Sequence, residues 1–216
     1  MQVLRTMEEQ LRSVLSALIV VDMTNDFCHP DGLAAKNRDL TPVNRIVPVI
    51  KILAEEARAS GVPVFFILQT ALPHDLSFSG PWVAVRERAP HSSPYVGLRG
   101  SWGQRVMAEL EPSPLDYQIE KFRYSSFVGT RLSHWLRGRG IKTVVITGAS
   151  TNVCVMATAM DAMELDFYPV IVEDAVASWN MALHEAALDT FRARYGLTAV
   201  SQDVIDMWNR DRGGRV

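Results

Sequence analysis

Three reactive side chains stand at the ends of short, largely apolar segments of the sequence. Asp22 ends the segment ALIVVD, Lys121 ends DYQIEK, and Cys154 follows KTVVITGASTNV. A thiol becomes a strong nucleophile when it loses its proton, and a nearby ammonium favours the ionised sulfur. A carboxylate can accept the thiol proton and later deliver it to a departing amine. If the three segments meet, these residue types predict attack on a carbonyl carbon by an ionised Cys154.

The residues just before Cys154 strengthen this prediction. Residues 148–152 read GASTN, and the helical pattern that follows places Cys154 in a first helical turn. Unpaired backbone N–H groups at a helix start favour a thiolate and can hold a developing oxyanion. Taken alone, each residue has an ordinary interpretation, with the cysteine as buried packing, Asp22 as a turn cap and Lys121 as a solvated side chain. The chemistry therefore depends on the three segments meeting.

The hydrophobic pattern predicts the elements that position these residues. Six segments read as strands, and most lack polar alternation, as expected for strands covered on both faces. Helical patterns separate them, which predicts an α/β fold with a parallel sheet. In such a sheet, ligands bind at the carboxyl ends of strands, where Asp22 and Lys121 stand. The expected strands are residues 16–22, 62–69, 116–121, 142–147, 167–173 and 196–200, and the expected helices are residues 42–60, 129–139, 151–165 and 180–195.

Residues 70–100 do not fit this alternation. They contain four prolines and show no clear period. A loop of about 30 residues inside a compact domain is often a lid or a binding loop. We expect this segment to be either a lid or a subunit contact, with a short helix near residues 82–88. The chain, residues 1–216, is expected to form a single domain whose core spans residues 14–205.

Composition narrows the class of protein. The 216 residues carry a formal net charge of -2 and 48% are hydrophobic, which is ordinary for a globular protein and does not indicate a nucleic-acid surface. The longest apolar runs are far below the roughly 20 residues that a membrane span needs. The N-terminal residues lack the pattern of a secretory leader, and there are two cysteines, Cys28 and Cys154. We expect a cytoplasmic protein that binds neither nucleic acid nor a membrane.

Three segments resemble, in order and spacing, the isochorismatase-like cysteine hydrolases: ALIVVDMTNDF, KFRYSSFVGTRL and VVITGASTNVCVMATAMDAMELDFYPVIVEDAVAS. That family includes nicotinamidases, N-carbamoylsarcosine and ureidoacrylate amidohydrolases, and biuret or triuret hydrolases. The resemblance implies a three-layer α/β/α sandwich with a mainly parallel, Rossmann-like sheet. It implies that Asp22, Lys121 and Cys154 form a catalytic triad. Because family members commonly form dimers or tetramers, we also expect a homodimer or homotetramer.

The resemblance assigns further roles around the cysteine. The family carries a cis peptide bond, not before proline, four residues ahead of the cysteine, which falls on Ala149–Ser150. The backbone N–H groups of Ser150 and Cys154 would then form an oxyanion hole. Isochorismatases proper cleave a vinyl ether without a thiol nucleophile, so a complete triad is similar to that of the amide-cleaving members. The implied reaction passes through a thioester and releases ammonia or an amine.

The residues after the second expected strand argue against a metal site. Nicotinamidases carry an Asp-x-His pattern there, whereas this chain has Gln69 and Thr70, and neither His74 nor His91 restores the pattern. We therefore expect an enzyme without a metal or another cofactor, and not a nicotinamidase. The segments GSWGQRVMAEL and EKFRYSSFVGTRL are similar to those of ureidoacrylate amidohydrolases. This favours a small amide or ureide substrate such as biuret, triuret, ureidoacrylate or an N-carbamoyl compound.

Substrate contacts are expected beyond Asp22, at the end of the second strand and beyond Lys121. Amides and aromatic rings there can hydrogen-bond and sandwich a flat ureide, although packing and turn capping explain them as well. N-carbamoylsarcosine hydrolases hold a substrate carboxylate with an arginine, and the matching region here offers Trp179 and Asn180 instead. Either the substrate lacks that carboxylate, or an arginine elsewhere binds it. The arginine candidates are Arg86, Arg88 and Arg123, and the expected substrate-binding residues are Asn25, Phe27, Gln69, Tyr124 and Phe127.

Two other functions stay open beside the amidohydrolase. An isochorismatase-type vinyl-ether hydrolase would keep the fold and would not need Cys154 as a nucleophile. A non-catalytic binding subunit would keep the fold and lose the chemistry.

Overall fold

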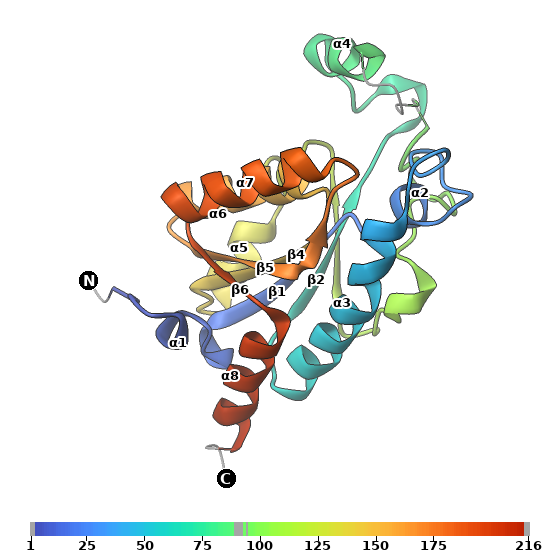
Figure 1. Cartoon of the computed structure of the whole chain (residues 1–216). Helices are drawn as coiled ribbons and strands as arrows, with labels where there is room; N and C mark the ends of the chain where they lie inside the picture. Colours follow the sequence, from blue (N-terminus) through green and yellow to red (C-terminus); the bar gives the residue numbers. More distant parts are fainter. Residues whose placement is uncertain (1–2, 89–92, 94, 214–216) are drawn as a thin grey trace.

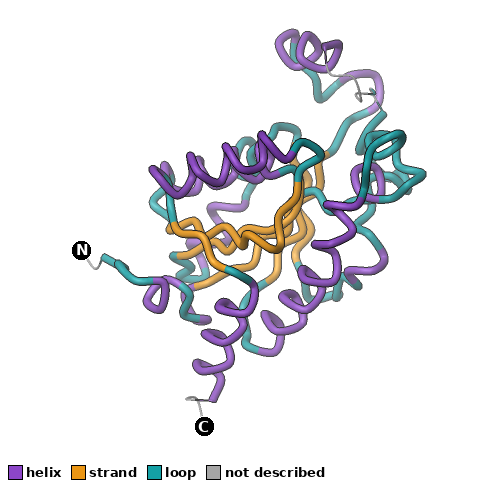
Figure 2. The backbone as a smooth tube through the Cα atoms, in the orientation of Figure 1, coloured by secondary structure: helices purple, strands orange, loops and turns teal. Residues whose placement is uncertain are grey.

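The computed structural model describes residues 3–88, 93 and 95–213, so His91 lies outside the described residues. Within them, parallel strands form one six-stranded sheet in the order β3-β2-β1-β4-β5-β6 (Figures 1 and 2). The α/β class and the predicted strands are confirmed, with bounds that shift by up to four residues. The strands are β1 (Ser16–Val21), β2 (Val64–Gln69), β3 (Tyr117–Lys121), β4 (Thr143–Ala149), β5 (Tyr168–Ala177) and β6 (Leu197–Ala199).

The strand with the largest shift is β5. Glu173 and Asp174 end its apolar run, so the sequence predicts a stop there. The strand instead continues past them, because its pairing with β4 shifts register and resumes at Val176 and Ala177. This extension carries the chain to the edge of the sheet where Cys154 lies.

Helices cover both faces of the sheet, which gives the expected three layers (Figure 1). Side chains of β1 alternate between two hydrophobic cores, with Leu18 in the core under α3 and α8 and Ile19 in the core under α5, α6 and α7. The described helices are α1 (Met7–Gln10), α2 (Asn25–Cys28), α3 (Thr41–Ala59), α4 (Gly80–Arg88), α5 (Leu132–Gly138), α6 (Met156–Glu164), α7 (Met181–Arg194) and α8 (Ser201–Gly213), with short 3-10 turns at Ser13–Leu15, Pro73–Asp75 and Ala108–Leu110.

Helix α8 was not predicted from the sequence. Only a narrow apolar stripe marks it, because most of its residues are polar or charged. Val204 and Trp208 on that stripe are fully buried in the core that α3 shares. Trp208 therefore packs inside the chain.

The order of the strands creates a crevice. The sheet grows from β1 in both directions, with β2 and β3 on one side and β4 to β6 on the other. Connections on the two sides of such a switch point diverge and leave a crevice at the carboxyl ends of the strands. Asp22 follows β1, Lys121 ends β3, and the turn with Cys154 follows β4. All three chemically interesting residues thus lie at one edge of the sheet.

The segment of residues 70–100 leaves the sheet and returns to it. Figure 1 shows α4 standing away from the layers, and none of its residues is buried. The segment is anchored where it returns, because Ala71 and Leu98 form an isolated parallel bridge and the Gly97 N–H donates to Asp26 Oδ2 at 2.7 Å. The expected short helix is present. Whether the segment acts as a lid or as a subunit contact stays a prediction.

Candidate active site

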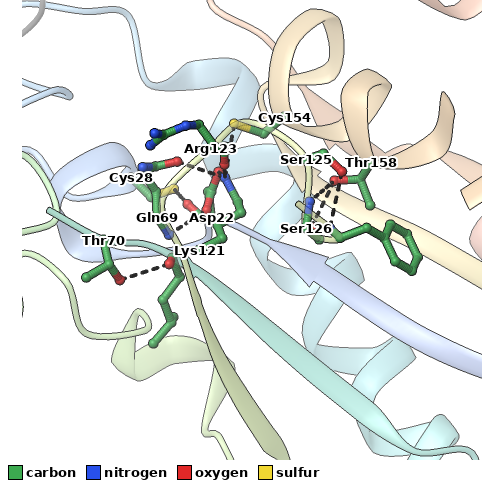
Figure 3. Close-up of polar contacts among 12 residues, drawn as sticks. Asp22, Cys28, Gln69, Thr70, Lys121, Arg123, Ser125, Ser126, Cys154 and Thr158 are labelled. Atoms are coloured by element: carbon green, nitrogen blue, oxygen red, sulfur yellow. Dashed lines mark hydrogen bonds and ion pairs between the residues drawn. The ribbon is translucent and has the colours of Figure 1, made fainter. Parts of the chain in front are cut away.

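Asp22, Lys121 and Cys154 meet in a buried cluster (Figure 3). The Lys121 ammonium lies 2.8 Å from Asp22 Oδ2 and 3.4 Å from Cys154 Sγ. Lys121 is fully buried, Asp22 is 1% exposed and Cys154 is 8% exposed. The sequence places these residues on three segments, with Asp22 and Cys154 132 positions apart, and the sheet brings their side chains together.

The carboxylate of Asp22 is held by the neighbouring strand. Its Oδ1 accepts a hydrogen bond from the Gln69 N–H at 2.8 Å, at the end of β2. Asp22 has a φ of 54°, a left-handed conformation that is uncommon for a residue other than glycine. The chain turns sharply after β1 at this point, and the carboxylate is fixed with one oxygen toward β2 and the other toward Lys121.

The ammonium of Lys121 has more acceptors than protons. Besides Asp22 and Cys154, it donates to Gln69 Oε1 at 3.0 Å and to the Arg123 carbonyl oxygen at 3.2 Å. Burial alone lowers the pKa of this ammonium, but the interactions with the Asp22 carboxylate and, to a smaller extent, with the Cys154 sulfur outweigh burial, so the pKa of Lys121 is raised. Lys121 therefore stays protonated at neutral pH and is oriented by its acceptors.

The turn that carries Cys154 differs from the expected first turn of an α-helix. Thr151–Val155 form a π-helical turn, and α6 begins only at Met156. The peptide bond Ala149–Ser150 is cis, at the position that the resemblance indicated. The hydroxyls of Ser150 and Ser178 both donate to Asn152 Oδ1, at 3.0 and 2.6 Å, and tie the turn to the end of β5.

The protonation of Cys154 corrects the sequence-based expectation of an ionised sulfur. Burial, followed by the negative charge of Asp22, raises the pKa of the Cys154 thiol, and the smaller opposing effect of Lys121 does not cancel them. The free protein therefore holds a neutral thiol at neutral pH. The composition of the triad alone could not show that Asp22 and burial would prevail over Lys121.

A cavity of about 830 Å³ opens onto the cluster. Of the predicted site residues, Asp22, Ser150 and Cys154 line it, as do Phe27, Gln69 and Tyr124. Lys121 does not line it, because its side chain lies behind the cavity wall with its ammonium on Asp22 and Cys154.

Asn25 and Phe127 are not among the lining residues, although we expected both to bind substrate. Asn25 is buried, and its amide donates to the Trp102 carbonyl oxygen at 2.9 Å. Phe127 packs in the core beneath α5 and α6, with its ring stacked on Phe167 at 5.8 Å between centroids. A hydrogen bond to the backbone thus accounts for Asn25, and core packing accounts for Phe127.

The structure separates the three candidate arginines. Arg86 lines the cavity and lies 3.4 Å from Asp75. Arg88 is exposed on α4 and is not a lining residue. Arg123 donates to the Ser77 carbonyl oxygen at 3.0 Å and covers the Trp82 ring.

Several lining residues were missed by the sequence reasoning. Arg38 and Asn37 lie in an irregular stretch before α3, and Trp82 and Phe78 lie in the segment of residues 70–100. No period marks these stretches. Asn152 had a usable signal, because it stands two residues before Cys154 in the turn that the sequence singled out.

Among the described residues, no group of three or more His, Cys, Asp or Glu side chains is arranged to hold a metal ion. None of the described helices combines the length and apolar character needed to cross a membrane.

The fold and the cluster define the class of protein: a three-layer α/β/α domain with Asp, Lys and Cys gathered at the carboxyl edge of its sheet. Residues 16–203 match the family model described as the Isochorismatase domain. The chain therefore belongs to the isochorismatase family, and the resemblance seen in the sequence is confirmed.

Individual relatives cover most of the chain. Ureidoacrylate amidohydrolase RutB of Caulobacter segnis is 30% identical over 199 residues, which cover 87% of this chain and 83% of the relative. The solved structure of N-carbamoylsarcosine amidase from Thermoplasma acidophilum is 33% identical with a TM-score of 0.69, and the match covers 86% of this chain and 96% of that one. A cysteine hydrolase from Pseudomonas syringae pv. phaseolicola 1448A has a TM-score of 0.84 at 24% identity, covers 98% and 99% of the two chains, and supports the fold alone.

Proposed function

We propose that this protein is a cysteine-dependent amidohydrolase that cleaves a C–N bond of a small amide or ureide and releases ammonia. The observation that carries the proposal is the contact of one buried ammonium with both a carboxylate and a thiol, at 2.8 and 3.4 Å. The arrangement offers a nucleophile, a proton acceptor and a fixed positive charge beside a cavity. The names of two relatives, ureidoacrylate amidohydrolase and N-carbamoylsarcosine amidase, support the same reaction class.

The first step couples attack to proton transfer. Because the pKa of Cys154 is raised, the sulfur must lose its proton as it attacks the substrate carbonyl carbon. Asp22 accepts that proton, which forms a neutral carboxyl group, while the new S–C bond pushes the carbonyl electron pair onto oxygen. Lys121 stabilises the negative charge as it moves from the carboxylate toward the sulfur and the substrate.

The oxyanion of the tetrahedral intermediate is held by backbone N–H groups of Ser150 and Cys154. Donors fixed by the fold before the reaction stabilise developing charge without reorganisation. The contacts of Ser150 and Ser178 with Asn152 keep this turn in one arrangement.

Collapse of the intermediate breaks the C–N bond. The proton on Asp22 passes to the leaving nitrogen, ammonia departs, and the carbonyl carbon remains bound to sulfur as a thioester. A water molecule then attacks the thioester and gives its proton to Asp22. When the C–S bond breaks, that proton returns to the sulfur and restores the neutral thiol.

Ammonia release from a panel of substrates tests the proposal. The panel contains biuret, triuret, ureidoacrylate, an N-carbamoyl amino acid and nicotinamide. We expect ammonia from at least one ureide and a loss of at least about 10³-fold in kcat for Cys154→Ser, because the nucleophile is removed. Cys28→Ala is the matched control, since Cys28 is buried and does not line the cavity.

Two outcomes contradict the proposal. Folded protein that releases no ammonia from any substrate favours the non-catalytic binding subunit. Turnover of a vinyl ether that survives Cys154→Ser favours the isochorismatase-type reaction. A small-molecule substrate and a homodimer or homotetramer remain predictions, and light scattering of the purified chain tests the second.

A further inference from the structure

One wall of the cavity carries a positive charge that no described residue neutralises. Among the described residues, the charged side chains that line the cavity are Asp22, Arg38, Asp39 and Arg86. Asp22 pairs with Lys121 at 2.8 Å, and Arg86 lies 3.4 Å from Asp75. Arg38 forms no ion pair within the described residues.

The other acidic lining residue does not neutralise Arg38. The Asp39 carboxylate accepts the Thr41 N–H at 2.9 Å, and its pKa is lowered by the hydrogen bonds from Thr41 and by the charge of Arg45. Burial lowers the pKa of Arg38, and no neighbouring carboxylate counteracts this effect. A cation that is half-buried without an anion is costly, and the site gains most from a ligand that supplies one.

Trp179 adds a second donor to the same wall. The guanidinium carbon of Arg38 lies 4.5 Å from the centroid of the Trp179 ring, and both residues line the cavity. Within the described residues, neither Arg38 Nε nor the indole nitrogen of Trp179 has a hydrogen-bond partner, and both atoms are buried. Buried donors are normally satisfied, so these two donors on the cavity wall are available to an acceptor that a ligand supplies.

The wall is tied to the turn that holds the nucleophile. Ser178 precedes Trp179, and its hydroxyl donates to Asn152 Oδ1 at 2.6 Å. Asn152 also accepts from the Ser150 hydroxyl at 3.0 Å, two residues before it in the same turn. Arg38, Trp179 and Cys154 all line the same cavity.

We propose that Arg38, backed by Trp179, binds a carboxylate of the substrate and thereby selects anionic ureides or amides over neutral ones. This inference rests on the proposed function, and it names the substrate class of that site. A guanidinium suits the task, because its planar donors match a carboxylate and remain charged at any physiological pH. Of the three arginines considered from the sequence, Arg86 lies 3.4 Å from Asp75, Arg88 does not line the cavity and Arg123 donates to the Ser77 carbonyl oxygen. Arg38, which the sequence did not single out, lines the cavity and forms no ion pair among the described residues.

A binding measurement that does not need turnover tests the inference. Calorimetric titration of Cys154→Ser protein compares ureidoacrylate with ureidoacrylamide, in which a neutral primary amide replaces the carboxylate. We expect ureidoacrylate to bind at least about tenfold more tightly, because a hydrogen bond to a charged group contributes more than a neutral one. Adding Arg38→Met should abolish the preference and leave the affinity for ureidoacrylamide within about threefold.

Two further variants, each combined with Cys154→Ser, separate a charge effect from a structural one. Arg38→Lys keeps the charge and should retain part of the preference. Lys36→Met removes one positive charge from the same irregular stretch, but Lys36 is exposed and does not line the cavity, so the full preference should persist.

The inference is overturned if the two ligands bind equally, if neither binds, or if the preference survives Arg38→Met. It is also overturned if Arg86→Met removes the preference and Arg38→Met does not. Ammonia assays of the unaltered chain report separately on the proposed function. A chain that releases no ammonia but prefers the carboxylate through Arg38 refutes the reaction alone, whereas ammonia release without a carboxylate preference refutes the role of Arg38 alone.

Discussion

The cavity has two regions that differ in burial and in the pairing of their charges. The catalytic floor consists of Asp22, Lys121 and Cys154, which are nearly inaccessible and are held by the ends of strands. The outer wall consists of residues 34–39, Trp179 and α4. No residue of α4 is buried, and Arg38 forms no ion pair with any residue that the structure describes. The floor satisfies its charges within the protein, whereas the wall leaves a charge for the ligand.

This difference assigns separate tasks to the two regions. Proton transfer between sulfur and carboxylate requires fixed distances, and a parallel sheet buried on both faces supplies them. Selection among substrates requires contacts that can change without disturbing the sheet, and surface loops supply those. Substitutions in the floor should therefore change stability and turnover much more than matched substitutions in the outer regions of the molecule.

The largest effect on stability is expected for Lys121→Met. Removing the ammonium leaves the buried carboxylate of Asp22 without its partner, which typically costs about 3–5 kcal/mol of unfolding free energy. Ammonia release should fall as well, because the charge that stabilises proton transfer is lost. Urea unfolding followed by fluorescence measures the first effect and the ammonia assay measures the second.

The matched control for that variant is Lys51→Met. Lys51 lies 2.8 Å from Glu111, the same separation as in the buried pair, but this pair is exposed. Exposed pairs are screened by water and often contribute nothing measurable, so we expect little change in unfolding. Equal losses in the two variants would show that burial of the floor is not what makes its ion pair matter.

The next largest effect on stability is expected for one of two matched glycine substitutions. Gly148 lies in β4 with a φ of 108°, and an added Cβ would meet the Val21 carbonyl oxygen at 2.1 Å. Gly148→Ala should therefore cost roughly 2–5 kcal/mol, through backbone strain and a clash with β1 beside Asp22. Gly80 begins α4 with no atom within 4 Å of an added Cβ, and Gly80→Ala should leave stability within about 0.5 kcal/mol. Thermal unfolding of both variants measures the contrast, and similar midpoints would contradict it.

The sequence was sufficient to predict the sheet and the residues of the floor. The apolar strands β1 and β4 have a strong pattern, and Asp22 follows β1 directly, while Cys154 lies in the turn after β4. Lys121 is the last residue of the more polar β3, so strand ends located all three residues. The sequence was insufficient for Asn25 and Phe127, because an amide in a turn and a ring in a core have the same local pattern as ligand-binding residues. It was also insufficient for Arg38, whose role depends on which charges lie near it after folding.

The protonation state of Cys154 could not be predicted from the sequence either. A lysine beside a cysteine predicts a thiolate if only those two residues are considered. Burial and the charge of Asp22 act in the opposite direction and raise the pKa of Cys154. Their relative sizes depend on depth and distance, which a one-dimensional pattern does not contain.

The smallest expected change is in the alkylation rate of the Asp22→Asn variant, which separates sulfur reactivity from turnover. Loss of the negative charge removes a cause that raises the pKa of Cys154, while Lys121 still favours the thiolate. The pKa of the thiol should fall, the thiolate fraction at pH 7.5 should rise, and alkylation of Cys154 by iodoacetamide should become several-fold faster. Ammonia release should nevertheless fall by about 10²-fold or more, because the proton acceptor is gone.

The control for these opposite changes, faster alkylation and slower ammonia release, is Asp39→Asn. Asp39 also lines the cavity and carries the same charge, but it is not among the groups that shift the pKa of Cys154. Mass spectrometry of the peptide that contains Cys154 gives the alkylation rate without interference from Cys28, which is fully buried. If Asp22→Asn slows alkylation, or if Asp39→Asn accelerates it equally, then the carboxylate of Asp22 does not hold the sulfur in its protonated form. Burial, the larger cause of the raised pKa, would then have to keep the thiol protonated without the carboxylate.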